Sequence, residues 1–310
     1  MYESIHKYMK VGIIQPMLYP MPHFQAEDSL RIILQDEFWD AVEVPPMGDA
    51  PTRARMRRMV DTAGVITSYV CPPRLFNTGQ NLNHLYKAER LKAVANVKVG
   101  IDEAYDYGAR DISIVSGKFE PATKHESYKA LTDSVSELCQ YAKSNGDLKI
   151  ALEIFDYDVD KCVLVGPAAE AAAFAGEIRA KYDNFGLLLD HGHLPLTHET
   201  PEEAVNAVKD YLIHAHLGNN VSSDLPRDTP SYGDQHPRFG FPGGAIGELE
   251  LADFFTQLLK IGFLNHKDPP IVSFEVKPQG AGTFDGYEDS TLVMANVKRM
   301  LNRAWSLVEI

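Results

Sequence analysis

Short runs of apolar and β-branched residues recur along the chain, and longer segments with a helical repeat separate them. Eight of these runs are typical of strands. Several are apolar at nearly every position, as expected for strands that are buried on both faces. We predict strands at Lys10–Gln15, Ala41–Val44, Gly64–Val70, Arg110–Val115, Lys149–Glu153, Phe185–Asp190, Tyr211–His216 and Pro270–Glu275.

The segments between these runs are predicted to be helices. In residues 87–107, apolar side chains recur every three or four positions, which places them on one face: Leu91, Val94, Val97, Ile101 and Ala104. The same spacing relates Leu251, Phe254, Phe255, Leu258 and Leu259. Gly166–Tyr182 is rich in Ala, which favours a helix. Thr200 begins another helix, because Pro201 and Glu203 complete a capping box; this helix is expected to end near Lys209.

The alternation of strands and helices predicts a parallel sheet whose crossovers are helices. Eight such units close into an α/β barrel, a (β/α)8 or TIM barrel, and residues 1–310 are predicted to form one such domain. An open doubly wound sheet is the alternative topology. Its dinucleotide-binding version has no support, because no G-x-G-x-x-G follows the first strand. An irregular segment at about 217–250, rich in Gly, Pro, Asp and Asn, is predicted to be a functional loop.

Composition and charge narrow the partners that the protein can have. Lys and Arg number 30 against 43 Asp and Glu, a net charge of −13, which disfavours nucleic acid and anionic membranes as partners. No stretch approaches the roughly 20 apolar residues of a membrane span, and no targeting segment is visible. We therefore expect a cytoplasmic protein that acts on a small molecule. A disulfide scaffold or a cysteine zinc site is not expected from the spacing of Cys71, Cys139 and Cys162.

Four predicted strands end on a residue that can bind a metal ion. The fifth to eighth strands supply Glu153, Asp190, His216 and Glu275. Because the carboxyl ends of barrel strands surround one mouth, these side chains can converge on one point. Three carboxylates and one imidazole suit Mn²⁺ best, with Mg²⁺, Co²⁺ and Zn²⁺ as alternatives. Any one of the carboxylates can instead cap a helix, but several buried together without a cation would be costly.

The order of these segments resembles the xylose isomerase-like superfamily of TIM barrels over essentially the whole chain. The resemblance rests on the Glu that ends the fifth strand, the D-x-x-H of Asp190 and His193, the H-x-H of the seventh strand and the Glu of the last strand. The superfamily includes ketose 3-epimerases, hydroxypyruvate and inosose enzymes, and endonuclease IV.

The epimerase branch implies particular roles for these residues. Its counterparts of Glu153, Asp190, His216 and Glu275 bind the metal ion. Those of Glu153 and Glu275 also exchange protons with the substrate, and that of His193 holds substrate oxygens. The resemblance thus implies a divalent-metal-dependent sugar isomerase or epimerase, and oligomers are common in the superfamily.

The chemistry agrees with these roles. A proton beside a ketone is too weakly acidic for a carboxylate to remove unaided, and a divalent ion stabilises the developing enediolate. Two carboxylates on opposite faces of the sugar then remove and return a proton. His191 and His214 are interpreted as packing or interior residues.

The segment after the seventh strand departs from the epimerase pattern. The Arg that follows the seventh-strand His in epimerases has its nearest counterpart in Arg238, beyond a long insertion; an ordinary loop cation is the alternative. Asp234 and His236 form a D-x-H pair, which binds an additional zinc in the endonuclease branch. That branch also needs histidines after the third and fourth strands, where this chain has none. We interpret His236 as an acid or base facing the substrate, and a pair that stabilises a turn is the alternative.

Two further residues have predicted roles near the same mouth. Glu43, at the end of the second strand, is a candidate for binding a sugar hydroxyl. The alternative is a residue of the barrel wall that pairs with Lys or Arg. Glu43 joins His193, Arg238 and Asp234 as candidate substrate-binding residues. Cys71 is expected to be unreactive, because no basic residue is adjacent.

A second resemblance offers a different reaction. The segments HAHLGN, YGDQHPRFG with its PGG turn, and SFEVKP are similar to the large subunit of bacterial C-glycoside deglycosidases. Those enzymes act on 3-oxo-glucosides together with a small β-rich partner subunit. The resemblance implies a lyase in which deprotonation at C2 is followed by loss of the aglycone. A non-catalytic sugar-binding subunit is a third interpretation, although such a role needs no set of four metal-ligand residues.

Overall fold

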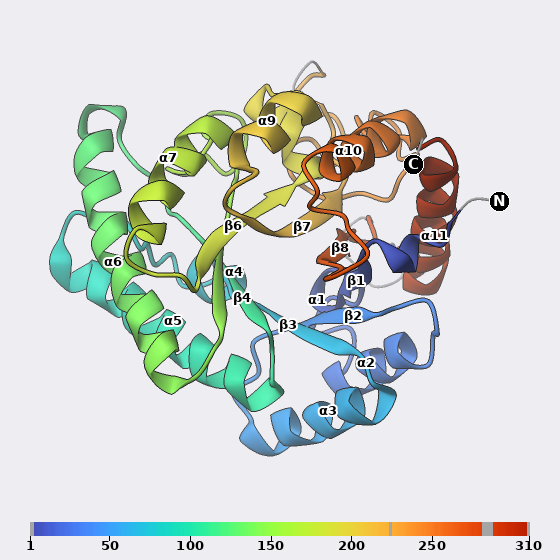
Figure 1. The fold of residues 1–310 in the computed structure, drawn as a ribbon, viewed down its shortest axis with the longest axis horizontal. Helices are drawn as coiled ribbons and strands as arrows, with labels where there is room; N and C mark the ends of the chain where they lie inside the picture. The colour runs from blue at the N-terminus through green and yellow to red at the C-terminus, as the bar shows by residue number, and fades with distance from the viewer. Residues whose placement is uncertain (1–2, 223–224, 281–287, 309–310) are drawn as a thin grey trace.

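The strands of the protein close into a parallel barrel. The computed structural model describes residues 3–222, 225–280 and 288–308. Each strand pairs with the next along the chain, and the eighth pairs with the first (Figure 1). The strands are β1 Lys10–Ile14, β2 Ala41–Val44, β3 Ile66–Val70, β4 Asp111–Val115, β5 Lys149–Glu153, β6 Phe185–Asp190, β7 Leu212–Gly218 and β8 Ile271–Glu275. The predicted TIM barrel is confirmed, and the open sheet is excluded.

Helices surround this barrel, and their apolar faces pack against the strands (Figure 1). The long helices are α2 Ala26–Leu34, α3 Ala50–Ala63, α5 Lys87–Tyr107, α6 Lys124–Asn145, α7 Ala168–Arg179, α9 Pro201–Val208, α10 Glu248–Lys260 and α11 Ser290–Ser306. Short turns of helix are α1 Gln15–Leu18, α4 Pro72–Phe76, α8 Leu194–Thr197, η1 Ile5–Lys7, η2 Pro121–Thr123 and η3 His191–His193. Within the described residues, no helix has the length and apolar character needed to cross a membrane.

The helix predictions hold with one exception. The capping box of α9 is present: Glu203 accepts the Thr200 backbone N–H at 2.9 Å, and the Thr200 hydroxyl accepts the Glu203 N–H at 3.3 Å. On α5 the predicted apolar face is buried except at Leu91, which is 43% exposed. Each three-residue step falls about 60° short of a full turn, so Leu91 lies beyond the edge of the buried stripe.

The segment between β7 and α10 is irregular. In residues 219–222 and 225–247 the structure places isolated bridges, from Val221 to Gly233 and to Gly244, and no helix or strand. Strand β7 runs two residues past its predicted end, so Leu217 and Gly218 belong to the barrel. The segment therefore starts directly at the barrel mouth.

A buried carboxylate ties one side of the barrel together. Glu103 of α5 accepts the Tyr69 hydroxyl at 2.7 Å and the Met47 backbone N–H at 3.1 Å. The Arg74 guanidinium lies 2.5 Å and that of Arg53 3.7 Å from its other oxygen. Glu103 thus connects α5 with β3, α3 and α4, and its charge is matched by two arginines.

Replacing Glu103 by Ala is expected to lower the free energy of unfolding by about 3 kcal/mol, because the largely buried guanidinium of Arg74 loses its carboxylate partner. Urea unfolding followed by circular dichroism measures this change. Glu137→Ala is the control: Glu137 forms a half-exposed pair with Lys98 at 2.8 Å, so its loss is expected to cost about 1 kcal/mol or less. Equal losses in the two variants would contradict this account.

The cysteines differ in accessibility. Burial raises the pKa of Cys71 and of Cys139 to about 12. Burial also raises the pKa of Cys162, but this thiol lies partly exposed in the segment after β5. Because the thiolate is the reactive form, a thiol reagent at neutral pH is expected to label Cys162 in the native protein, and the other two only after unfolding. Cys162→Ser should remove the native reaction. Rapid native labelling of Cys71 would show that its surroundings are open.

Candidate metal and catalytic site

The barrel brings the predicted metal ligands together. Glu153, Asp190 and Glu275 are the last residues of β5, β6 and β8, and His216 lies two residues before the end of β7. One ligand atom from each of the four lies within 4.8 Å of the others. His216 is level with Asp190 in the β6–β7 register, whereas on the other side it pairs with Ser273, and Glu275 pairs with Gly218 two residues further along β7.

These residues fit a divalent ion. Each has one buried atom without a hydrogen-bond partner among the residues that the structure describes: Glu153 Oε1, Asp190 Oδ2, His216 Nδ1 and Glu275 Oε2. Two of these atoms, His216 Nδ1 and Glu275 Oε2, lie 2.9 Å apart, a contact that pairs charges only when the ring is protonated. The other oxygen of Asp190 accepts the backbone N–H groups of Gly192 at 2.7 Å and Gly218 at 3.0 Å. Buried polar atoms left unpaired are costly, and a cation among them satisfies all four. Carboxylate oxygens with one imidazole suit Mn²⁺ and similar ions.

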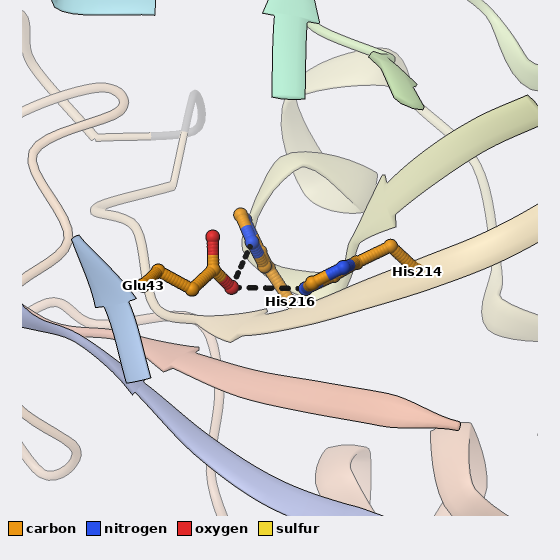
Figure 2. A group of neighbouring side chains, drawn as sticks. All are labelled: Glu43, His214 and His216. Carbon is orange, nitrogen blue, oxygen red and sulfur yellow. Dashed lines mark hydrogen bonds and ion pairs between the residues drawn. The ribbon is translucent and has the colours of Figure 1, made fainter. Parts of the chain in front are cut away.

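The carboxylate of Glu43 orients the His216 ring. Figure 2 shows the Glu43 side chain facing both His214 and His216. Its Oε1 lies 3.0 Å from His216 Nε2 and 2.9 Å from His214 Nε2. When His216 donates this hydrogen bond through Nε2, its Nδ1 is left with a lone pair toward the three carboxylates. His214 is the interior residue that was predicted, and its Nδ1 lies 3.3 Å from Asp111 Oδ1.

Glu43 therefore has a role that the sequence did not indicate. Instead of pairing with Lys or Arg, it pairs with two histidines and is completely buried. Burial acts to raise the pKa of Glu43, but the two histidines outweigh it and hold that pKa well below its usual range. Binding of a sugar hydroxyl by Glu43 stays a prediction.

A second group of residues shares Asp190 with the first. Asp234 Oδ1 lies 2.7 Å from His236 Nε2 and 3.2 Å from His193 Nε2. His236 Nδ1 lies 3.7 Å, and His193 Nε2 3.5 Å, from Asp190 Oδ2. His193 is buried rather than a surface loop residue, and its Nδ1 lies 2.8 Å from the Ile154 carbonyl. The predicted D-x-H pair thus reaches the predicted metal ligands.

The charges of this interior are strongly coupled. Burial raises the pKa of Glu153. It acts on Glu275 in the same sense, but His236 and His216 outweigh it and lower the pKa of that carboxyl. Burial opposes the protonation of His236, yet Asp234 and Glu275 raise its pKa to about 9.

Other predicted residues lie outside the cluster. The Nε of Arg238 donates to Glu288 at 2.7 Å, and its side chain is 34% exposed. His191 stacks on Phe254 with ring centroids 4.7 Å apart, which confirms it as a packing residue. Two contributors were missed in the sequence, Asp111 and Lys161. Asp111 is the first residue of a strand and Lys161 lies in the polar run DYDVDKC, so neither occupies the carboxyl end of a strand, the signal that pointed to the predicted ligands.

Comparisons with known proteins agree with the barrel. A family model described as xylose isomerase-like TIM barrel matches residues 36–295. No curated protein matches the chain in sequence. A D-psicose 3-epimerase from Clostridium cellulolyticum H10 superposes with a TM-score of 0.72 at 16% identity, over 97% of this chain and 100% of that one. An L-ribulose 3-epimerase gives 0.70 at 18% identity, over 96% and 95%. A 3-keto-D-glucoside 4-epimerase from E. coli gives 0.66 at 14% identity, over 95% and 99%. At these identities the structural likeness concerns the fold.

Replacing Glu43 by Gln is expected to raise the dissociation constant for Mn²⁺ by about 10- to 100-fold, because the carboxylate that orients His216 is lost. Titration calorimetry of the metal-stripped protein measures the constant. Glu37→Gln, at an exposed position, is the control and should leave it unchanged. Full Mn²⁺ affinity in a folded Glu43→Gln protein would show that His216 needs no such partner.

Proposed function

Because the chain belongs to the xylose isomerase-like TIM barrel family, we propose that it is a divalent-metal-dependent sugar isomerase or epimerase. It acts by removing a proton next to the carbonyl of a keto-sugar. The observation that carries this proposal is the convergence of Glu153, Asp190, His216 and Glu275, each with a buried atom that lacks a hydrogen-bond partner among the described residues. Epimerases of ketoses are among the solved structures with the same fold, which supports sugar chemistry.

Glu153, Asp190, His216 and Glu275 would hold the ion, with Mn²⁺ favoured by the donor set. When bound, a divalent ion stabilises negative charge that develops on the substrate's carbonyl and hydroxyl oxygens. Asp190 is the most firmly fixed of these residues, since two backbone N–H groups hold its second oxygen. Glu275 is the most exposed, with 15% of its side chain accessible, and therefore faces the side from which substrate enters.

Glu153 and Glu275 are the groups that exchange the proton. They come from β5 and β8, with β6 and β7 between them, so they approach the site from different sides of the mouth. One removes the proton as a base and the other returns one as an acid. His193 and His236 hold substrate oxygens or transfer a further proton, and Asp234 orients both rings. A substrate contact by Arg238 requires release of its pair with Glu288.

A second candidate reaction starts with the same step. The fold is shared with an enzyme named 3-keto-D-glucoside 4-epimerase, and this chain's HAHLGN and SFEVKP segments resemble the large subunit of C-glycoside deglycosidases. On a 3-oxo-glucoside, removal of the C2 proton is followed by cleavage of the bond from C1 to the aglycone. The electrons of the C2–H bond form a C1–C2 double bond in the sugar, and the aglycone atom that leaves C1 takes up a proton. This alternative includes a small β-rich partner subunit.

Incubation of the Mn²⁺-loaded protein with ketohexoses in deuterated water separates these functions. The expected result is an isomerised sugar that carries solvent deuterium at the reacting carbon, measured by mass spectrometry and NMR. Glu275→Gln, at saturating Mn²⁺, should slow the exchange by about 10²- to 10⁴-fold, because a proton-transfer group is lost. Glu120→Gln, at an exposed site, is the control.

Other outcomes of this experiment identify the alternatives. Exchange and aglycone release from 3-oxo-glycosides, with no reaction of ketohexoses, would establish the lyase instead. Binding of sugars without exchange in either class would leave a sugar-binding subunit. Unchanged turnover after the metal has been stripped would contradict the proposed mechanism.

A further inference from the structure

The segment after β5 is folded around a single carboxylate. Asp156 is buried and accepts the backbone N–H groups of four residues that follow it: Val159 at 3.0 Å, Asp160 at 2.7 Å, Lys161 at 2.8 Å and Cys162 at 3.2 Å. Because one side chain satisfies so many backbone donors, the directions of Asp160 and Lys161 are fixed locally.

Lys161 joins this segment to the loop that follows β7. Its ammonium group donates to the backbone carbonyl of Asp234 at 3.0 Å and lies 3.0 Å from Asp234 Oδ2. Asp160 contributes at the same point: its Oδ2 accepts from Lys161 at 2.9 Å and from the Asp234 N–H at 2.9 Å. Gly233, at φ +83°, leaves room for this approach, since a Cβ there would lie 2.9 Å from Asp160 Oδ2.

The two oxygens of Asp234 have different partners. Oδ2 faces Lys161, whereas Oδ1 faces His236 Nε2 at 2.7 Å and His193 Nε2 at 3.2 Å. Asp234 is buried, so without the ammonium one of its oxygens would be unpaired in the interior. Lys161 therefore contributes a fixed positive charge beside the histidines without touching the metal ligands.

The backbone at His236 needs an anchor of this kind. Its φ is +48°, in the left-handed region that costs free energy for a residue with a side chain. The Lys277 backbone N–H donates to the His236 carbonyl at 2.7 Å and holds one side of the residue. On the N-terminal side of His236, the backbone is held at Asp234, two residues earlier, by its contacts with Lys161 and Asp160.

We propose that Lys161 is a positioning residue for this site: through Asp234 it fixes the rings of His236 and His193 in their places beside Asp190. The expected effect of Lys161 on turnover rests on the proposed function. Its expected effect on the positions of the histidines rests only on the geometry of the loops. Lys161 acts by binding Asp234, and the substrate is bound and converted by other residues.

The test compares Lys161→Met, Lys161→Arg and the parent protein, all as full chains loaded with Mn²⁺. In Lys161→Met, amide hydrogen exchange in peptides covering residues 229–240 is expected to quicken about 10-fold or more, because buried hydrogen bonds to a charge are lost. The kcat for the isomerisation should fall by about 10- to 100-fold, with the Mn²⁺ dissociation constant unchanged. Lys161→Arg keeps the charge and should restore most of both. Lys118→Met, at an exposed lysine, is the control and should resemble the parent.

Three results would overturn the inference. The first is parent-like exchange and kcat in Lys161→Met. The second is a loss of Mn²⁺ affinity as large as the loss of kcat, since Lys161 would then act on the metal ligands. The third is equal acceleration of exchange throughout the barrel, which would mean general destabilisation. If the parent isomerises no ketohexose, the proposed function fails, but the positioning role can still be tested by NMR. The ring nitrogen signals of His236 are then expected to shift in Lys161→Met and not in Lys118→Met.

Discussion

The arrangement of the interior follows from one constraint: carboxylates buried close together need positive charge among them. The barrel encloses a connected set of such groups, linked through histidine rings, at Glu43, Asp111, Glu153, Asp190, Asp234 and Glu275. Among the residues that the structure describes, Lys161 is the lysine in ion-pair contact with this set, and it pairs with Asp234. The remaining charge is shared by the histidine rings that link these carboxylates and, in our proposal, by a divalent ion among the four strand-end residues.

Closure of the barrel makes this concentration of charge achievable. Glu43 and His216 are 173 residues apart in sequence, yet they lie in hydrogen-bond contact because β2 and β7 both line the closed interior, with only β1 and β8 between them. Each strand is held by its neighbours and covered by a helix, so the side chains at its end have little freedom. The four proposed metal ligands are therefore arranged without an ion, which lowers the cost of ordering them when one binds.

How far the sequence predicts the site depends on the position of each residue. Glu153, Asp190 and Glu275 could be found because each ends an apolar strand, and a parallel barrel gathers strand ends at one mouth. The contact of Glu43 with His214 and His216 depends on distances across the barrel, which no local spacing encodes. Lys161 was missed for a related reason: its role arises where two irregular segments meet, and neither has a periodic pattern to predict its course. His193 was identified by its motif, but its burial against Asp234 depends on the course of the segment that follows β7.

Epimerisation and elimination begin with removal of the same kind of proton, so the four strand-end residues do not distinguish them. The two reactions differ in the second proton transfer. In epimerisation the proton goes to the opposite face of the sugar carbon, and in elimination it goes to the departing aglycone atom. Glu153 and Glu275 supply two carboxyls on different strands, which suits the first. The pair of His193 and His236, held by Asp234 beside Asp190, supplies donors on the side of the β7 loop. The lyase would have to place its leaving group on that side, so the β7 loop is the part of the molecule where the two reactions make different demands.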